Sequence, residues 1–229
     1  MISRLHYITQ DLPNFSHAQL VEFACKGGAD WVQLRVKNKP YEEWLKIAQE
    51  TKLICLKYGA KFIINDSAQI AKEVEADGVH LGKNDMNPKE ARKMLGNNFI
   101  IGGSANSRED VRKQMADGCD YIGIGPFRHT TTKEKLSPIL GIDGIRNIIR
   151  AMSPSPRQPS SAKVGGTTRW VDFPMIAIGG IKLEDIEPLM QTGVHGVAVS
   201  SGINSLENKT ETTRRFLTLL GMTTSVMPL

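Results

Sequence analysis

Two carboxylates follow short apolar runs of this sequence, in positions that suit a metal ion. Asp66 comes directly after the run KFIIN, and Asp85 follows the run GVHL. Mg²⁺ usually takes one or two protein carboxylates together with oxygens of a substrate phosphate. Asp66 and Asp85 are therefore candidate metal ligands. The structural alternatives are that Asp66 caps a helix at Ser67 and that Asp85 shapes a turn.

Three cations also follow apolar runs and could neutralise a diphosphate. Arg35 ends the run WVQLR, Lys37 stands close behind it, and Lys133 follows the run YIGIG and a threonine triplet. Arginine offers a planar fork to phosphate oxygens, and lysine a compact point charge. For Lys37, which has Lys39 nearby, a solvated surface pair is the alternative interpretation.

Hydroxyls, amides and glycines at the ends of the other runs extend this set. Glycines let the backbone approach an anion, and the first N–H groups of a helix are unpaired. For the threonines an ordinary polar loop is the alternative, and His80, inside VHL, is expected in the interior of the fold rather than in catalysis. The set comprises Gln33, Asn65, Ser104, Thr130, Thr131, Thr132, Gly179, Gly180, Ser200 and Ser201.

The apolar runs themselves indicate buried parallel strands. Helix-like segments alternate with them, such as the one after Pro40, with an expected apolar stripe of Trp44, Leu45, Ala48, Leu53 and Leu56. Near-continuous apolar runs are typical of strands buried on both faces, and ligands bind beyond the carboxyl ends of such strands. Eight strands are the number that closes a (β/α)8 TIM barrel, so we expect that α/β fold, although periodicity also allows an open doubly wound sheet. The runs begin at Leu5, Trp31, Lys61, Gly78, Phe99, Tyr121, Met175 and Gly196.

One stretch, residues 153–172, breaks the alternation of strands and helices. It is rich in Ser and Pro and has no hydrophobic period, which favours a flexible insertion before the seventh strand. The alternation resumes at Phe173, so a linker to a second domain is not expected. We predict one barrel domain over residues 1–229, with a frayed tail at 221–229.

Composition narrows the class of protein further. The chain has 229 residues, 40% of them hydrophobic, and 29 Lys+Arg against 24 Asp+Glu give a net charge of +5. The hydrophobic content excludes a disordered chain. The net positive charge is mild and does not by itself indicate binding to nucleic acid. The dispersed cysteines Cys25, Cys55 and Cys119 match neither a disulfide framework nor a zinc spacing. We expect a cytoplasmic protein with no signal peptide and no membrane association, because no long apolar segment occurs.

The ordered motifs resemble those of the thiamine-phosphate synthases. They are QLRVK (33–37), IND (64–66), GVHLG (78–82) with Asp85, GGSA (102–105), GIGP followed by TTTK (123–133), AIGGI (177–181) and VSSGI (199–203). The resemblance implies a (β/α)8 barrel that joins 4-amino-2-methyl-5-hydroxymethylpyrimidine diphosphate to 4-methyl-5-(2-phosphoethyl)thiazole. The products would be thiamine phosphate and pyrophosphate, with Mg²⁺ as the cofactor.

The resemblance also implies roles for single residues. Arg35, Lys37 and Lys133 would assist the departure of pyrophosphate, and Asp66 and Asp85 would bind Mg²⁺. Val36 departs from the pattern, because many members carry an acidic residue there. The pyrimidine diphosphate would contact Gln33, Leu34, Arg35, Val36, Lys37, Asn65, Ser104 and Lys133, and the thiazole phosphate would contact Thr130, Thr131, Thr132, Gly180, Ser200 and Ser201.

Two other functions stay open at this point. A thiazole tautomerase of the same superfamily would transfer protons without a metal–diphosphate site, and Asp66, Asp85 and Lys133 argue against it. A non-catalytic phosphate-binding barrel is the second alternative. In each case the partners are small molecules rather than nucleic acid or membrane, and a homo-oligomer is allowed.

Overall fold

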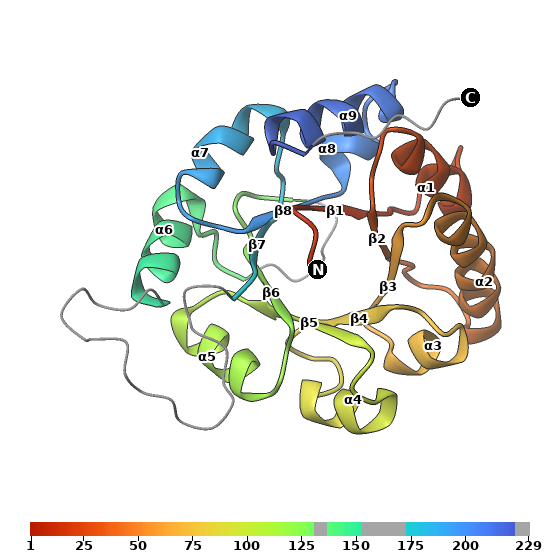
Figure 1. Ribbon diagram of the computed structural model, residues 1–229, viewed down its shortest axis with the longest axis horizontal. Helices are drawn as coiled ribbons and strands as arrows, with labels where there is room; N and C mark the ends of the chain where they lie inside the picture. The colour runs from red at the N-terminus through yellow and green to blue at the C-terminus, as the bar shows by residue number, and fades with distance from the viewer. Residues whose placement is uncertain (131–136, 153–172, 223–229) are drawn as a thin grey trace.

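A computed structural model of the protein describes residues 1–130, 137–152 and 173–222, and its strands form a closed parallel barrel (Figure 1). Each strand pairs in parallel with the next, and β8 pairs with β1 through Leu5 and Val197. The predicted (β/α)8 fold is thus confirmed, and the open sheet is excluded. The strands are β1 (Leu5–Ile8), β2 (Trp31–Leu34), β3 (Lys61–Asn65), β4 (Gly78–Leu81), β5 (Ile100–Ala105), β6 (Tyr121–Ile124), β7 (Met175–Ile178) and β8 (Gly196–Val199).

The helices form a ring outside the strands (Figure 1). Several begin at side chains that accept a backbone N–H of the first turn, as Ser16, Ser67, Asn87 and Ser107 do. The helices are α1 (His17–Lys26), α2 (Tyr41–Tyr58), α3 (Ala68–Glu73), α4 (Pro88–Leu95), α5 (Arg108–Ala116), α6 (Gly141–Met152), the 3₁₀ turn η2 (Leu183–Asp185), α7 (Ile186–Met190), α8 (Ser201–Asn204) and α9 (Lys209–Leu219).

Two apolar clusters stabilise the barrel. The larger fills the space between strands and helices, while a smaller one, including Ile8, Trp31 and Tyr121, lies inside the barrel. Ile2 packs against the inner cluster, and its carbonyl oxygen lies 2.9 Å from His195 Nε2, just before β8 begins. The N-terminal segment therefore covers the end where the strands begin, and this leaves the carboxyl ends of the strands for ligands.

The predicted apolar stripe of α2 is partly wrong. Ala48, Thr51 and Cys55 are the buried residues of this helix, whereas Leu53 and Leu56 are 66% and 63% exposed. The buried positions follow the spacing of one helix face, and the predicted stripe mixed residues of two faces. Helix α8, directly after β8, was not predicted at all. The predicted insertion at 153–172 and most of the predicted tail lie outside the described residues and stay predictions.

Candidate active site

The loops after β2 and β3 bring a lysine and a carboxylate together. Lys37 Nζ donates a hydrogen bond to Asp66 Oδ2 and forms an ion pair with it. The backbone of Asp66 adopts a left-handed conformation, with φ of 69°, and its N–H donates to the His80 carbonyl at 2.8 Å. Burial acts to raise the pKa of Asp66, but the hydrogen bond and charge of Lys37 outweigh burial and leave the pKa below its usual value.

Asp85 joins this pair from the loop after β4. Its Oδ2 accepts the Gly82 N–H at 2.7 Å, so the predicted turn does form. Burial, followed by the negative charge of Asp66, raises the pKa of Asp85. Two carboxylates that interact this way attract a cation, because a positive charge between them would relieve their repulsion.

The donor set limits which metal the pair could hold. Among the described residues, no three or more His, Cys, Asp or Glu side chains gather as a metal site. A structural zinc ion, which needs four protein ligands, is therefore not supported by that part of the chain. Mg²⁺ fits Asp66 and Asp85 better, because it completes its shell with water and substrate phosphate oxygens.

The alternative roles for Asp66 and Lys37 do not hold. Ser67, rather than Asp66, caps α3, because the Ser67 hydroxyl accepts the Ile70 N–H at 3.2 Å. Lys37 pairs with Asp66, while Lys39 pairs with Glu43 on α2 at 2.6 Å. Lys37 thus belongs to the site at the strand ends, and Lys39 belongs to the surface of α2.

A polar network lies in the barrel beneath the carboxylates. His80 Nε2 lies 3.0 Å from Ser104 Oγ, and His80 Nδ1 lies 3.1 Å from the Tyr121 hydroxyl, which also hydrogen-bonds to Gln33. His80 is 5% exposed, which agrees with its predicted interior position. Asn65, also buried, pairs in register with His80 on the adjacent strand. Gln33, Asn65 and Ser104 are therefore brought together at this end of the barrel.

The loop after β6 packs closely on the glycine pair after β7. A Cβ at Gly180, whose φ is 65°, would lie 2.5 Å from Arg128 Cγ and 2.9 Å from the His129 carbonyl oxygen. Arg128 also donates to Asp185 Oδ1 at 2.5 Å. The loop after β6 can approach this closely only because the residues after β7 are glycines. This packing role was not predicted from the sequence. Lys182 N–H donates to Asp185 Oδ2 at 2.8 Å, so this helix start has one N–H fewer for an anion than expected.

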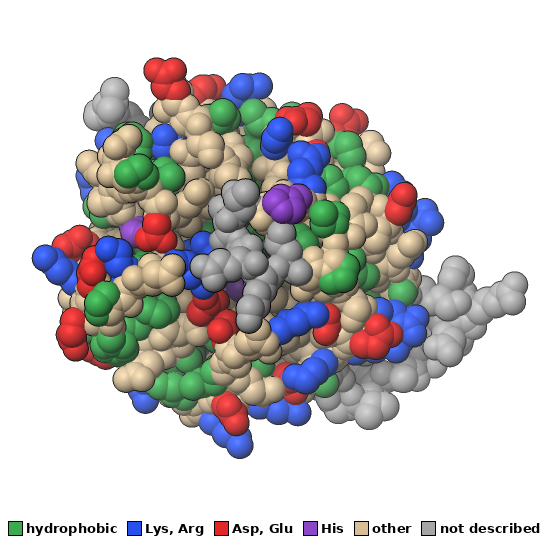
Figure 2. All heavy atoms as spheres, turned by 180° about the vertical axis from the view of Figure 1, so that it is seen from behind, with side chains coloured by type: hydrophobic (Ala, Val, Ile, Leu, Met, Phe, Trp, Pro, Cys, Tyr) green, Lys and Arg blue, Asp and Glu red, His purple; other side chains and the backbone are tan. Residues whose placement is uncertain are grey.

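Charged side chains of both signs surround the middle of the face seen from behind (Figure 2). On the part of this face that the structure describes, Lys and Arg do not merge into one broad basic surface. That distribution suits a small anionic ligand rather than the backbone of a nucleic acid.

Comparison with known proteins identifies the family. A family model described as thiamine monophosphate synthase matches residues 5–203. The chain is 44% identical over 209 residues to the thiamine-phosphate synthase of Flavobacterium johnsoniae, covering 91% of this chain and 92% of that one. It is 43% identical over 215 residues to that of Bacteroides fragilis, covering 94% and 98%. The chain belongs to the thiamine monophosphate synthase family.

A solved structure agrees with this assignment to the thiamine monophosphate synthase family. The thiamine phosphate pyrophosphorylase of Pyrococcus furiosus superposes with a TM-score of 0.77 at 29% identity, covering 95% of each chain. The family model spans residues 5–203, so the strand-end positions discussed above lie within the region that it matches.

The other expected contact residues differ in how much of their side chains the structure leaves accessible, and their contacts with substrate stay predictions. Leu34 and Val36 are buried in the cluster between strands and helices, so only their backbone could touch a ligand. An apolar side chain suits position 36 here, because Val36 is only 4% exposed. Thr131, Thr132 and Lys133 lie outside the described residues, while Thr130 precedes them. Ser200 and Ser201 lie at the start of α8, where Ser200 Oγ accepts from Asn204 Nδ2 at 3.3 Å.

Thr9, Asp11 and His17 contact the site but were missed in the sequence. Thr9 Oγ1 accepts the Arg35 N–H at 2.9 Å, and Asp11 Oδ2 accepts the Lys37 N–H at 3.2 Å. Thr9 and Asp11 follow the apolar run of β1, so the strand-end rule applied to the first strand would have found both.

Proposed function

We propose that the chain joins 4-amino-2-methyl-5-hydroxymethylpyrimidine diphosphate to 4-methyl-5-(2-phosphoethyl)thiazole, releasing pyrophosphate and forming thiamine phosphate. It would thus act as a thiamine-phosphate synthase, a transferase. The observation that carries the proposal is the group formed by Lys37, Asp66 and Asp85, which gathers the ends of β2, β3 and β4. Thiamine-phosphate synthases at 44% and 43% identity over most of the chain support it.

The residues of the chain act mainly on the leaving group. Arg35 and Lys37 would bind the diphosphate oxygens and neutralise the charge that grows there as the C–O bond breaks. Lys133 is proposed for the same role. Asp66 and Asp85 would hold Mg²⁺, which when bound supplies further positive charge to the departing pyrophosphate.

The remaining chemistry needs positioning rather than a strong base. The aminopyrimidine ring delocalises the cation left on its methylene carbon, and the thiazole nitrogen attacks that carbon. Gln33, Asn65 and Ser104 would orient the pyrimidine, and Thr130 to Thr132, Gly180, Ser200 and Ser201 would hold the thiazole phosphate. Holding both substrates in line makes the second step effectively intramolecular.

The tautomerase alternative is disfavoured by the position of His80. Both of its ring nitrogens lie within hydrogen-bonding distance of protein hydroxyls, and the side chain is buried. A general base must reach the proton that it removes. His80 is better suited to orienting Ser104 and Tyr121.

The proposal also covers the compartment and the oligomeric state. Both substrates are small and anionic, and we place the reaction in the cytoplasm. Self-association stays a prediction. Separately, no helix in the described residues is long and apolar enough to cross a membrane.

The test is an assay of pyrophosphate release with both substrates, with and without Mg²⁺. We expect release and thiamine phosphate formation only when both substrates and Mg²⁺ are present. Turnover without Mg²⁺ after chelation would refute the metal role, and no turnover in any condition would refute the proposed reaction.

A further inference from the structure

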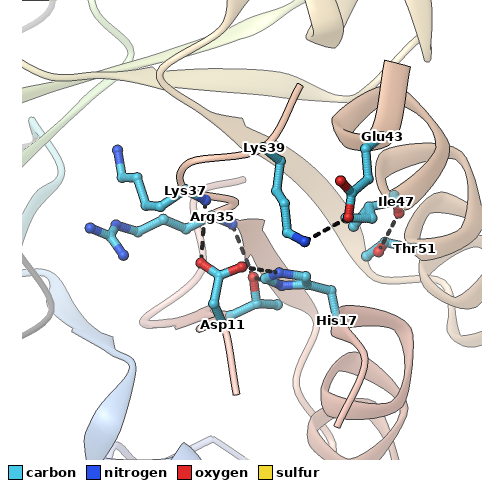
Figure 3. A network of polar contacts seen from close by, with 9 residues as sticks. Asp11, His17, Arg35, Lys37, Lys39, Glu43, Ile47 and Thr51 are labelled. Atoms are coloured by element: carbon cyan, nitrogen blue, oxygen red, sulfur yellow. Dashed lines mark hydrogen bonds and ion pairs between the residues drawn. The ribbon is translucent and has the colours of Figure 1, made fainter. Parts of the chain in front are cut away.

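Two backbone N–H groups of the β2–α2 loop are held by side chains that follow β1. As described above, the Arg35 N–H donates to Thr9 Oγ1 and the Lys37 N–H donates to Asp11 Oδ2. Val36 lies between them and is buried in the core. The loop is thus fixed on both sides of Val36, and the side chains of Arg35 and Lys37 extend together away from this network (Figure 3).

His17, the first residue of α1, connects the two acceptors. His17 Nδ1 lies 2.9 Å from Thr9 Oγ1, and His17 Nε2 lies 3.1 Å from Asp11 Oδ1 (Figure 3). A carboxylate only accepts, so Nε2 must carry the proton that is donated to Asp11. In neutral histidine Nδ1 is then an acceptor, and it accepts a hydrogen bond from the Thr9 hydroxyl.

These assignments give each of the four hydrogen bonds one donor and one acceptor, and the bonds converge on Asp11. Arg35 N–H donates to Thr9, Thr9 O–H donates to His17 Nδ1, His17 Nε2–H donates to Asp11, and Lys37 N–H donates to Asp11. Burial lowers the pKa of His17 and outweighs the hydrogen bond to Asp11 and its negative charge, both of which raise that pKa. The lowered pKa favours the neutral form of His17. The arrangement therefore has a single consistent pattern of donors and acceptors.

We infer that Thr9, Asp11 and His17 form a positioning relay that fixes where Arg35 and Lys37 meet the diphosphate. This inference rests on the proposed function, because it assigns Arg35 and Lys37 to the leaving group. The relay residues themselves do not touch substrate. They act by holding the loop backbone, and misplacement of a catalytic group by about 1 Å can cost on the order of 10²-fold in rate.

Thr9→Val tests the relay, because it keeps the shape of the side chain and removes only the hydroxyl. We expect kcat/KM for the pyrimidine diphosphate to fall by about 10-fold or more, because the loop loses one anchor. KM for the thiazole phosphate should stay within about twofold, and Thr9→Ser, which restores the hydroxyl, should recover most of the activity.

Thr51→Val is the matched control. Thr9 and Thr51 are both 0% exposed, and the Thr51 hydroxyl donates to the Ile47 carbonyl at 2.7 Å inside α2. This variant loses an equally buried hydroxyl whose hydrogen bond lies within α2, so its kinetics should match the unmodified protein within about twofold. Urea unfolding of each variant confirms that it is folded.

A double substitution distinguishes positioning from general damage. In an Arg35→Ala background, Thr9→Val should cost much less than it does alone, because its effect passes through Arg35. An equal cost in both backgrounds, or an equally poor Thr9→Ser, would overturn the relay, as would a Thr9→Val that is fully active. If Thr9→Val does not fold, Asp11→Ala at the more exposed end of the relay takes its place. It is tested in a Lys37→Ala background, because Asp11 accepts the Lys37 N–H, and an equal cost in both backgrounds would overturn the relay.

Binding of Mg²⁺–pyrophosphate, measured by calorimetry, separates this inference from the proposed reaction. If the unmodified protein binds pyrophosphate but makes no thiamine phosphate, the proposed reaction fails and the relay is judged from Kd alone. Weaker pyrophosphate binding in Thr9→Val, with no change in Thr51→Val, then supports the relay. Unchanged binding in both variants refutes it.

Discussion

Lys37 and Asp66 form an ion pair that joins the loop after β2 to the loop after β3. The pair places a cation suited to phosphate beside a carboxylate suited to a metal, and Asp85 interacts with the same carboxylate. In the proposed reaction, Lys37 would exchange its contact with Asp66 for one with the diphosphate, and Asp66 would exchange it for one with Mg²⁺. The ion pair would thus hold both groups near the positions that binding requires.

Replacing Lys37 with glutamine should therefore impair catalysis strongly. The neutral amide can still hydrogen-bond to Asp66, but it supplies no positive charge to the leaving pyrophosphate. We expect Lys37→Gln to lower kcat/KM for the pyrimidine diphosphate on the order of 10²-fold, the usual cost of losing one such electrostatic contact. Steady-state kinetics with the thiazole phosphate saturating measures the effect.

Lys39→Gln is the control for that experiment. Lys39 pairs with Glu43 on the surface of α2 at 2.6 Å, whereas Lys37 pairs with Asp66, so the ammonium of Lys39 is not part of the carboxylate group. Activity within about twofold of the unmodified protein is expected. Similar losses in both variants would mean that the net charge of the loop matters rather than the position of Lys37.

Asp85→Asn should weaken the binding of Mg²⁺ without disturbing the turn. An asparagine oxygen can still accept the Gly82 N–H that Asp85 accepts at 2.7 Å. One negative charge is lost from the carboxylate pair, so the Mg²⁺ concentration giving half-maximal activity should rise by about 10-fold or more. A titration of activity with Mg²⁺ measures this. Asp143→Asn on the exposed start of α6 is the matched control, and an unchanged midpoint in Asp85→Asn would remove Asp85 from the metal site.

The fold was predictable because its strands are apolar on both faces. Runs such as KFIIN and YIGIG have no polar alternation, and their ends place Asp66 and Gly125 at the ligand side of the barrel. Relations between loops were not predictable. The pairing of Lys37 with Asp66 depends on the left-handed backbone at Asp66, and the contact of His17 with Thr9 depends on how α1 packs after β1. On α2, single-residue hydrophobicity favoured Leu53 and Leu56, but packing selected the face of Thr51 and Cys55 instead.

The buried His6 should make stability depend on pH. Burial, followed by the charge of His80, lowers the pKa of His6 well below its usual value, so the folded protein keeps it neutral. The unfolded chain takes up a proton as pH falls through about 6.5, and stability is therefore lost below that pH. From pH 7 to pH 5.5 this single group should cost about 1 kcal/mol of unfolding free energy.

His6→Phe tests this dependence by urea unfolding at the two pH values. Phenylalanine can keep the stacking on Trp31, whose ring centre lies 4.3 Å from that of His6, although it loses the contact of Nε2 with the Ser3 carbonyl. The variant should be less stable at pH 7 but lose less stability on acidification than the unmodified protein. The same loss between the two pH values in both proteins would show that His6 does not carry this dependence.

Gly102 should tolerate no side chain, because Tyr121 occupies the space beside it. A Cβ at Gly102 would lie 2.2 Å from Tyr121 Cζ, and Tyr121 is only 1% exposed. Gly102→Ala should therefore lower the unfolding free energy by about 1–3 kcal/mol, the usual cost of overpacking a core. Because Tyr121 contacts His80, which contacts Ser104, activity should fall as well.

Tyr121→Leu tests the cause of this loss, because it shortens the side chain that a Cβ at Gly102 would meet. The double variant Gly102→Ala/Tyr121→Leu should therefore lose less unfolding free energy than the two single losses added together. Additive losses in urea unfolding would show that the clash is relieved elsewhere in the barrel.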